Sequence, residues 1–423
     1  MIATRCLEPE LAGSVALRLT DWVRDGDTIV WGQADAQPRL LTRLLVGQRH
    51  DWRSLKIFLG IGCSNILHPN HTDVFELVSY CGTGSNRRLS VAGALDILPC
   101  HYSDLPAMIR SGRLQVDVVM LRVSAPDAHG RYSLGLSNDY LCAAVESARV
   151  VIAEVDEHVP WTHGERSLVR SDFDLLVHAH TDDAGHGAKA GGAAGPIERA
   201  IGRHVASLVE DGSTLQVGIG KVPDAVLAAL SDHRDLGFHS GNAGDGWAAL
   251  AQKGVLTNAR KSRDTGVSVA GMVMGSESLY RFVHQNPALQ LRGADYTHNL
   301  NVLSTLDRFV AINSGLEVDL SGQVNAEVAA GNYVGALGGG ADFLRGAHAS
   351  RGGLPIIALA STGGNQSRIV STLSGPATLS AGDAGIVVTE FGIADLRGKT
   401  LTDRRRLLLD IAHPDYRDVL ERS

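Results

Sequence analysis

The sequence predicts an α/β protein with two domains, each built on a mostly parallel β-sheet. Three observations predict this class. Short β-branched runs alternate with helical patterns along the chain, glycines gather where the predicted strands end, and one Gly-rich stretch divides the chain near its middle. Strands that alternate with helices of about ten or more residues are typical of βαβ units, in which crossover helices join parallel strands.

The predicted strands recur in both halves of the chain. They are Asp27–Trp31, Leu55–Leu59, Val116–Leu121 and Val150–Val155 in the first half, and Thr214–Gly218, Phe309–Ile312, Leu354–Leu359 and Gly385–Thr389 in the second. The stretch Glu210–Gly220 is similar to Arg24–Gln33, because in both an Asp-Gly turn leads into a strand that ends at glycine. An Asp-Gly turn is common by itself, yet the pair predicts two halves of related architecture.

The predicted domain boundaries follow from length and composition. A chain of 423 residues is long for one domain, which favours two. The stretch Asp182–Pro196 is rich in small residues and has no apolar period, as in a flexible linker. We expect an N-terminal domain over residues 1–185, a Gly-rich linker over 186–197 and a C-terminal domain over 198–423.

Composition excludes several classes of partner. The net charge of −7 and the scattered Lys and Arg residues give no basic surface, so we expect no binding to nucleic acid or to a membrane. No segment reaches the roughly 18 uninterrupted apolar residues of a membrane span, and Glu8, Pro9 and Glu10 interrupt any signal peptide. The five cysteines form no CxxC pair, and the histidines and acids have no metal-ligand spacing. We expect a cytoplasmic protein without a metal site.

The glycines suggest where a ligand approaches the backbone. Gly338, Gly339 and Gly340 are consecutive, and such a run can present several N–H groups to an oxyanion or phosphate, although a tight turn that packs a helix on a sheet explains it equally well. Gly218 and Gly220 lie in a strand-to-helix turn that matches neither a P-loop nor a GxGxxG fingerprint. This turn still offers a helix N-terminus to an anion.

Longer sequence words identify a family. They are Val123–Gly130, Tyr132–Gly135, Pro160–Gly164, Leu215–Gly220, Pro223–Val226, Ile312–Ser314, Glu317–Leu320, Gly322–Asn325, Gly338–Gly339, Asp342–Phe343, Thr389–Glu390, Gly392–Gly398 and Ile411–Asp415. In this order they resemble the acetyl-CoA hydrolase/transferase family, which includes 4-hydroxybutyrate and butyrate:acetate CoA-transferases, over roughly residues 90–420.

The resemblance implies a fold and a chemistry. It implies two open α/β domains of the CoA-transferase type, with an active site in the cleft between them and a homo-oligomeric enzyme. The coenzyme A thioester would be a substrate and not a permanently bound cofactor, and the second partner would be a small-molecule acceptor. In the family's transferases a glutamate attacks the acyl-CoA and forms an anhydride, then a glutamyl-CoA thioester.

Two departures from the family pattern concern that chemistry. The word that contains the nucleophilic glutamate matches His239–Gly246 and puts Gly241, which has no side chain, at the nucleophile's position. The word that contains an oxyanion-holding asparagine matches Tyr296–Leu300 and puts His298 at the asparagine's position, with Asn299 next to it. The oxyanion loop is retained through Gly338 and Gly339.

Three interpretations follow. Water or another acceptor attacks the thioester directly, with His298 or His239 as the base. Alternatively, a CoA-transferase uses a substitute carboxylate, for which Glu317 is the nearest candidate, although family members that have the nucleophile also carry this acid. Finally, the protein binds CoA without catalysis.

Overall fold

The structure, a computed structural model, describes residues 5–7, 17–179 and 194–423. The chain folds into two compact units. Unit 1 comprises residues 1–189 together with 271–295, and unit 2 comprises residues 190–270 together with 296–423. The sequence prediction assigned 271–295 to the C-terminal domain, whereas in the structure this segment belongs to unit 1.

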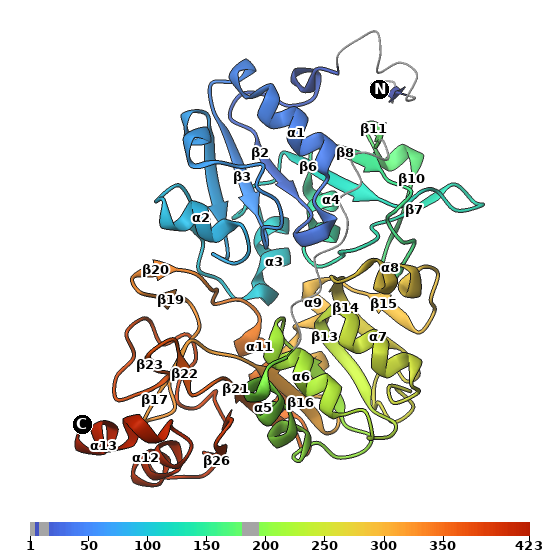
Figure 1. Cartoon of the computed structure of the whole chain (residues 1–423). Helices are drawn as coiled ribbons and strands as arrows, with labels where there is room; N and C mark the ends of the chain where they lie inside the picture. The colour runs from blue at the N-terminus through green and yellow to red at the C-terminus, as the bar shows by residue number, and fades with distance from the viewer. Residues whose placement is uncertain (1–4, 8–16, 180–193) are drawn as a thin grey trace. The chain divides into compact units, whose positions relative to one another are not determined.

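Unit 1 is built on an eight-stranded, fully parallel sheet with the order β1-β11-β8-β6-β2-β3-β4-β5 (Figure 1). Its strands are β1 (Arg5–Leu7), β2 (Thr28–Trp31), β3 (Leu55–Leu59), β4 (Phe75–Ser79), β5 (Asp96–Ile97), β6 (Val118–Val123), β8 (Val150–Val155) and β11 (Leu175–His178). Its helices include α1 (Arg39–Gly47), α2 (Asn86–Val91), α3 (Leu105–Arg110), α4 (Leu141–Ser147) and α8 (Glu277–Val283). The strands β2, β6 and β8 are buried along their whole length, as expected when both faces of a parallel sheet are covered.

The strands of unit 2 lie in the order β26-β25-β21-β16-β12-β13-β14. The boundary between unit 2 and unit 1 falls within β14, after residue 270. The strands are β12 (Thr214–Val217), β13 (Gly237–Ala243), β14 (Ser268–Val273), β16 (Phe309–Asn313), β21 (Leu354–Ala358), β25 (Ile386–Thr389) and β26 (Gly392–Asp395). The helices are α5 (Pro196–Ala206), α6 (Lys221–Ala229), α7 (Asp245–Gln252), α10 (Leu300–Leu303), α11 (Gly340–Ala349), α12 (Leu401–Asp410) and α13 (Pro414–Arg422). From β13 to β26 these strands are parallel to their neighbours, except β26, which is antiparallel to β25.

The two sheets share one strand order. The run β11-β8-β6-β2-β3-β4 of the first sheet corresponds strand by strand to β25-β21-β16-β12-β13-β14 of the second. In each, the chain begins at a central strand, adds later strands on one side and then crosses to the other side. This repeat confirms the prediction of two related halves. The reversal of strand order lies between β12 and β16 in unit 2, and α/β sheets bind ligands at the carboxyl ends of strands at such a reversal.

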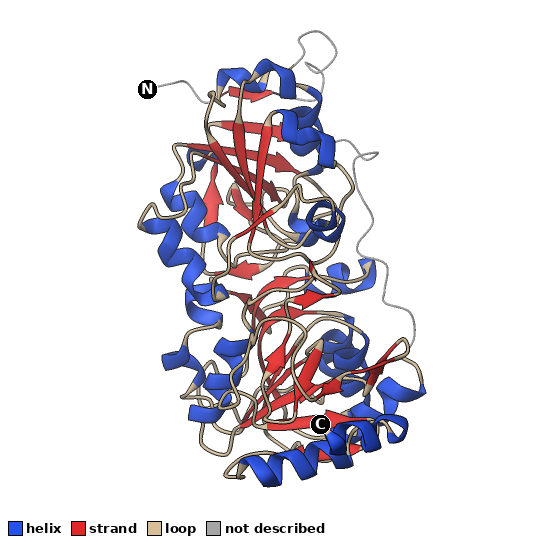
Figure 2. Ribbon diagram, turned by 90° about the vertical axis from the view of Figure 1, so that its left-hand side faces the viewer, coloured by secondary structure: helices blue, strands red, loops and turns tan. Residues whose placement is uncertain are grey.

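The predicted strands all exist. Leu55–Leu59 and Val150–Val155 have the predicted bounds, whereas the strand expected at 116–121 occupies Val118–Val123. The prediction of an α/β fold with mostly parallel sheets is therefore confirmed, and Figure 2 shows the strands and helices of each unit. Most of the predicted linker lies outside the described residues, and its last two residues, 196 and 197, begin α5 because proline fits the first turn of a helix.

The segment 271–295 joins unit 1 through specific contacts. The hydroxyl of Tyr280 donates a hydrogen bond to the Asp35 carboxylate at 2.5 Å. The strand β15 (Leu289–Leu291) pairs in parallel with β9 (His163–Gly164), and the Ala294 N–H donates to the Asp139 carbonyl at 2.9 Å. These contacts explain why a simple two-part division of the sequence did not predict the unit.

In the described part of the chain, no helix combines the length and the apolar character that crossing a bilayer requires.

Candidate active site in unit 2

Three parallel strands of unit 2 bring candidate residues to one level. The register pairs Thr214 of β12 with Gly237 of β13 and with Phe309 of β16. Four residues further along each strand, Gly218, Gly241 and Asn313 therefore lie at the same carboxyl edge. The Gly218 N–H donates to the Ile312 carbonyl at 3.0 Å, which extends the pairing to this level.

The side-chain amides of Gln216 and Asn313 form a hydrogen-bonded pair between β12 and β16, where the strand order reverses. Asn313 Nδ2 donates to Gln216 Oε1 at 2.9 Å, and Gln216 Nε2 donates to Asn313 Oδ1 at 3.3 Å. A Cβ atom on Gly340 would lie 3.9 Å from Asn313 Oδ1, so α11 begins beside this pair. Sequence reasoning did not select Asn313 as a site residue, although the Asn-Ser pair after the strand 309–312 was a signal that could have done so.

The predicted glycines form the starts of two helices at this edge. Gly220 precedes α6 with a φ of +125°, and Gly338, with a φ of +56°, leads into α11 through Gly339. Neither helix start is capped by a side chain. The first N–H groups of each helix have no acceptor within the helix and carry the positive end of its dipole. This arrangement suits a phosphate, or an oxyanion that develops during acyl transfer.

Gly241 and His298 are neighbours in space. A Cβ atom on Gly241 would lie 3.4 Å from both Cε1 and Nε2 of His298 and 3.7 Å from a ring carbon of Phe343. The His298 ring packs on Phe343 with 4.3 Å between the ring centroids. The two positions that the sequence analysis predicts as departures from the family pattern therefore lie in one local site. The sequence alone did not show this adjacency.

His298 is held as a neutral imidazole. Its side chain is buried, and its Nδ1 lies 2.8 Å from the Thr297 hydroxyl. Burial, the larger cause, and the nearby His239 together lower the pKa of His298 to about 3. At neutral pH the ring therefore carries one proton, and its Nε2 edge borders the space at Gly241.

His239 supports this segment from β13. It is fully buried, and its Nε2 lies 3.0 Å from the Thr297 carbonyl, so Nε2 must carry the proton because a carbonyl only accepts. Its ring also packs at the edge of Phe309. Successive side chains of a strand point to opposite faces, so positions 239 and 241 of β13 lie on the same face of the sheet. The contacts give His239 a role in holding the residue before His298.

Glu317 lies on β17 (Glu317–Asp319), in a small sheet with β18 (Val324–Asn325) and β24 (Ile369–Val370). Both of its carboxylate oxygens accept hydrogen bonds from Ser374, from the backbone N–H at 2.8 Å and from the hydroxyl at 2.6 Å. The two bonds fix the orientation of the carboxylate against Ser374.

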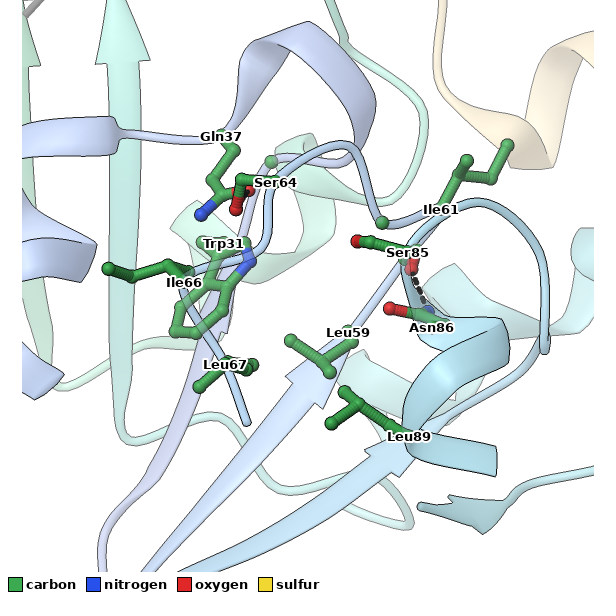
Figure 3. A pocket seen from close by; sticks show the side chains of 13 residues that line it. Trp31, Gln37, Leu59, Ile61, Ser64, Ile66, Leu67, Ser85, Asn86 and Leu89 are labelled. Carbon is green, nitrogen blue, oxygen red and sulfur yellow. Dashed lines mark hydrogen bonds between the residues drawn. The ribbon is translucent and has the colours of Figure 1, made fainter. Parts of the chain in front are cut away.

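Unit 1 has a small cavity at the carboxyl ends of β2 and β3 (Figure 3). Apolar side chains form much of its wall, and Gln37, Ser64, Ser85 and Asn86 add polar groups. No side chain in its lining is charged, and none of the predicted site residues belongs to it. Across the described residues, no three His, Cys, Asp or Glu side chains are grouped as metal ligands.

Two mostly parallel sheets with one repeated strand order, and glycine turns at the carboxyl edge of the second, are typical of an α/β protein of the CoA-transferase type. Two family domains match the chain, the acetyl-CoA hydrolase/transferase N-terminal domain over residues 16–178 and the corresponding C-terminal domain over residues 275–423. The chain belongs to the acetyl-CoA hydrolase/transferase family. Gly241 lies between the two matched ranges.

Similar proteins agree with this assignment. The 4-hydroxybutyrate coenzyme A transferase of Clostridium kluyveri is 38% identical over 405 residues, which cover 94% of each chain. The crystal structure of RipA from Yersinia pestis is 32% identical with a TM-score of 0.90 and covers 100% of this chain and 97% of that one. The 4-hydroxybutyrate CoA-transferase from Porphyromonas gingivalis is 34% identical with a TM-score of 0.80, covering 99% and 96%.

Relatives are named both as CoA transferases and as acetyl-CoA hydrolases. The predictions of the family and of an acyl-CoA hydrolase/transferase-like enzyme are therefore confirmed. The expected cleft between domains, the homo-oligomer and the cytoplasmic location stay predictions.

Proposed function

We propose that this enzyme acts on a CoA thioester by direct attack of water or of a small-molecule acceptor, without a glutamyl-CoA intermediate. One observation carries the proposal. Gly241 is the residue that the family resemblance matches to the nucleophile's position, and the His298 ring lies within contact distance of the place of its missing Cβ. A change at Gly241 alone would suggest that the nucleophile was simply lost. Changes at two positions that touch in space favour a site adapted to a different reaction.

The proposed reaction uses the backbone turns to stabilise charge. The thioester carbonyl would lie by the N–H groups at the start of α11, near Gly338 and Gly339, which would hold the oxyanion of a tetrahedral intermediate. The acceptor oxygen attacks from the space beside Gly241. The carbon–sulfur bond then breaks, CoA leaves as a thiolate, and the acceptor's proton passes to that thiolate. With water as the acceptor, the products are a free acid and CoA.

In the proposed reaction, the neutral His298 ring donates a hydrogen bond to the reacting groups. A base with a pKa of about 3 takes a proton only weakly. If the Thr297 hydroxyl donates to Nδ1, then Nε2 carries the proton and donates into the space beside Gly241. This arrangement supports His298 as a donor to the oxyanion or to the acceptor, and makes His298 a poor general base.

The two other interpretations make different predictions. A transferase with a substitute carboxylate would have to free Glu317 from its hydrogen bonds to Ser374. A CoA-binding protein without catalysis would show affinity for acyl-CoA and no turnover. Neither has a described contact that favours it over direct attack.

The test is thioester turnover with a probe for the covalent intermediate. Purified protein is given short-chain acyl-CoAs with and without carboxylate acceptors, and CoA release is followed by a thiol reagent. Borohydride reduces a glutamyl-CoA to an alcohol, so we expect turnover that survives borohydride and no modified glutamate by mass spectrometry. Inactivation together with a reduced glutamate would refute direct attack, and binding without any turnover would leave the third interpretation.

A further inference from the structure

The hydrogen bonds of Glu317 continue beyond Ser374. The strand register places Glu317 opposite Asn325, and the Asn325 Nδ2 donates to Glu317 Oε2 at 3.4 Å. Asn325 is fully buried. One carboxylate therefore binds a residue after β24 and a residue at the end of β18, which joins the two neighbours of β17.

Asn325 in turn ties down the chain that follows it. Its Oδ1 accepts the N–H groups of Glu327 and Val328 at 3.0 and 3.1 Å. Its Nδ2 also donates to the Val328 carbonyl at 2.7 Å. All the polar atoms of this side chain are therefore used to fix the first residues after β18.

The chain from Ala326 to Gly339 is a single folded excursion, which we name the 326–339 segment. It contains the short hairpin β19 (Val328–Ala329) and β20 (Asn332–Tyr333). The N–H groups of Val334 and Gly335 return to the Glu327 carbonyl at 2.8 and 2.9 Å, which closes the base of the hairpin. A Cβ on Gly335 would overlap the Ala326 carbonyl oxygen, so the two ends of the base are in close backbone contact.

The segment ends at the turn that begins α11. After Gly335 the chain has only two residues before Gly338, whose φ of +56° starts the turn. Phe343, on the first turn of α11, packs on the His298 ring. A shift at the base of the segment therefore moves the glycine turn and the wall of the candidate site.

We propose that Glu317 is a positioning residue, whose carboxylate is oriented by Ser374, holds the 326–339 segment through Asn325 and thereby fixes the Gly338–Gly340 turn at the substrate. The inference rests on the proposed function for its catalytic consequence. The positioning itself is a property of the fold and is measured without turnover.

Two variants test the carboxylate and one variant serves as a matched control. Glu317→Ala removes both acceptors, and Ser374→Ala removes only the hydroxyl donor. Asp319 lies two residues further along β17 and accepts the N–H and hydroxyl of Ser321 and the N–H of Gln323, so Asp319→Ala removes the same kind of bonds from a different turn. Hydrogen exchange of the full chain is measured by mass spectrometry, together with affinity for CoA and with kcat and KM.

We expect Glu317→Ala to raise the exchange rate of amides in the 326–339 segment by about 10-fold and Ser374→Ala by a smaller factor, since each lost hydrogen bond weakens the closed state. Turnover should fall about 10-fold while the protein stays folded. Asp319→Ala should speed exchange at Ser321–Gln323 and leave the 326–339 segment protected.

Three results would overturn the inference. Unchanged exchange in the 326–339 segment of Glu317→Ala would show that the carboxylate does not hold it. Equal exposure of the segment in Asp319→Ala would show general loss of stability. Recovery of a covalent adduct on Glu317 from acyl-CoA would make it a nucleophile. If no thioester is turned over by the unaltered protein, the proposed function fails, and the exchange experiment still decides the positioning role.

Discussion

At the scale of single residues, the proposed site depends on the contact between Gly241 and His298. The sequence predicted both as sites of departure from the family, because each falls in a recognisable word. It did not predict their contact, since the residues are far apart in the chain and only the folded structure shows position 241 of β13 beside the His298 ring. Phe343 was not predicted as a site residue for a different reason, because a phenylalanine on a helix is ordinarily a core residue.

The space at Gly241 can be tested by filling it stepwise. In Gly241→Ala the added Cβ meets His298 at 3.4 Å, an ordinary contact, so we expect turnover within about threefold of the unaltered enzyme. In Gly241→Glu the longer side chain fills the acceptor's space, and turnover should fall by about 10²-fold or more, as for loss of a key catalytic interaction. Initial rates with one acyl-CoA measure both. A Gly241→Glu variant that transfers CoA to acetate through a trapped glutamyl-CoA would show that the site was merely vacated.

The buried His298 should also make stability depend on pH. Its pKa is about 3 in the folded protein, against its usual 6.5 when unfolded. Between these values the unfolded chain binds more protons, so stability is full above pH 6.5 and is lost as the pH falls toward 3, by up to about 1.4 kcal/mol per pH unit. His298→Asn removes this dependence. Urea unfolding at pH 7.5 and 5 should show a larger loss for the unaltered protein than for the variant, and equal losses would contradict the burial of a neutral ring.

At the scale of elements, the site is made by the starts of α6 and α11 at the carboxyl edge of a parallel sheet. The sequence predicted both turns because glycine and proline mark them directly. It left open whether the glycines bind a ligand or only allow tight packing. The structure shows which of them have a backbone conformation that requires glycine. Gly220 has a φ of +125°, whereas Gly218 has ordinary backbone geometry and its nearest atoms would lie 3.8 Å from an added Cβ.

These two glycines give a matched pair of variants. Gly220→Ala forces a side chain into a conformation that only glycine adopts readily, and should cost about 1–3 kcal/mol of stability. Gly218→Ala should leave the melting temperature nearly unchanged while it weakens CoA binding if the ligand approaches the backbone there. Thermal melts and calorimetry with CoA measure the two effects. Equal melting temperatures for both variants would contradict the assigned backbone of the turn.

At the scale of the whole molecule, the chain is a repeat of one strand order interrupted by an exchange of segments. The sequence predicted the repeat from a pair of similar Asp-Gly-strand words. It did not predict that residues 271–295 belong to unit 1, because local propensity says nothing about which sheet a strand joins. The contacts that decide it, such as Tyr280 with Asp35, join residues that are 245 positions apart.

Tyr280 therefore tests the integrity of unit 1. Tyr280→Phe removes the donor to the buried Asp35 carboxylate and should cost about 1–3 kcal/mol, because a buried acceptor loses a hydrogen bond. Tyr416→Phe is the control, since its hydroxyl donates to the Asn365 carbonyl at an exposed position. Urea unfolding measures both free energies. Equal, small effects would show that the segment 271–295 docks without this contact.

Because unit 1 is built from two separate stretches of the chain, it can be completed only late in translation. A ribosome makes residues 1–189 first, yet β9 acquires its partner β15, and Asp35 its donor Tyr280, only once the polypeptide has been extended through residue 295. In the interval, the emerging polypeptide also exposes the first strands of unit 2 before β16 can flank β12. Both units are therefore incomplete while residues 190–270 are being translated. If translation stops between codons 190 and 270, the truncated chain lacks residues of both units, and we expect chaperones and proteases to bind it.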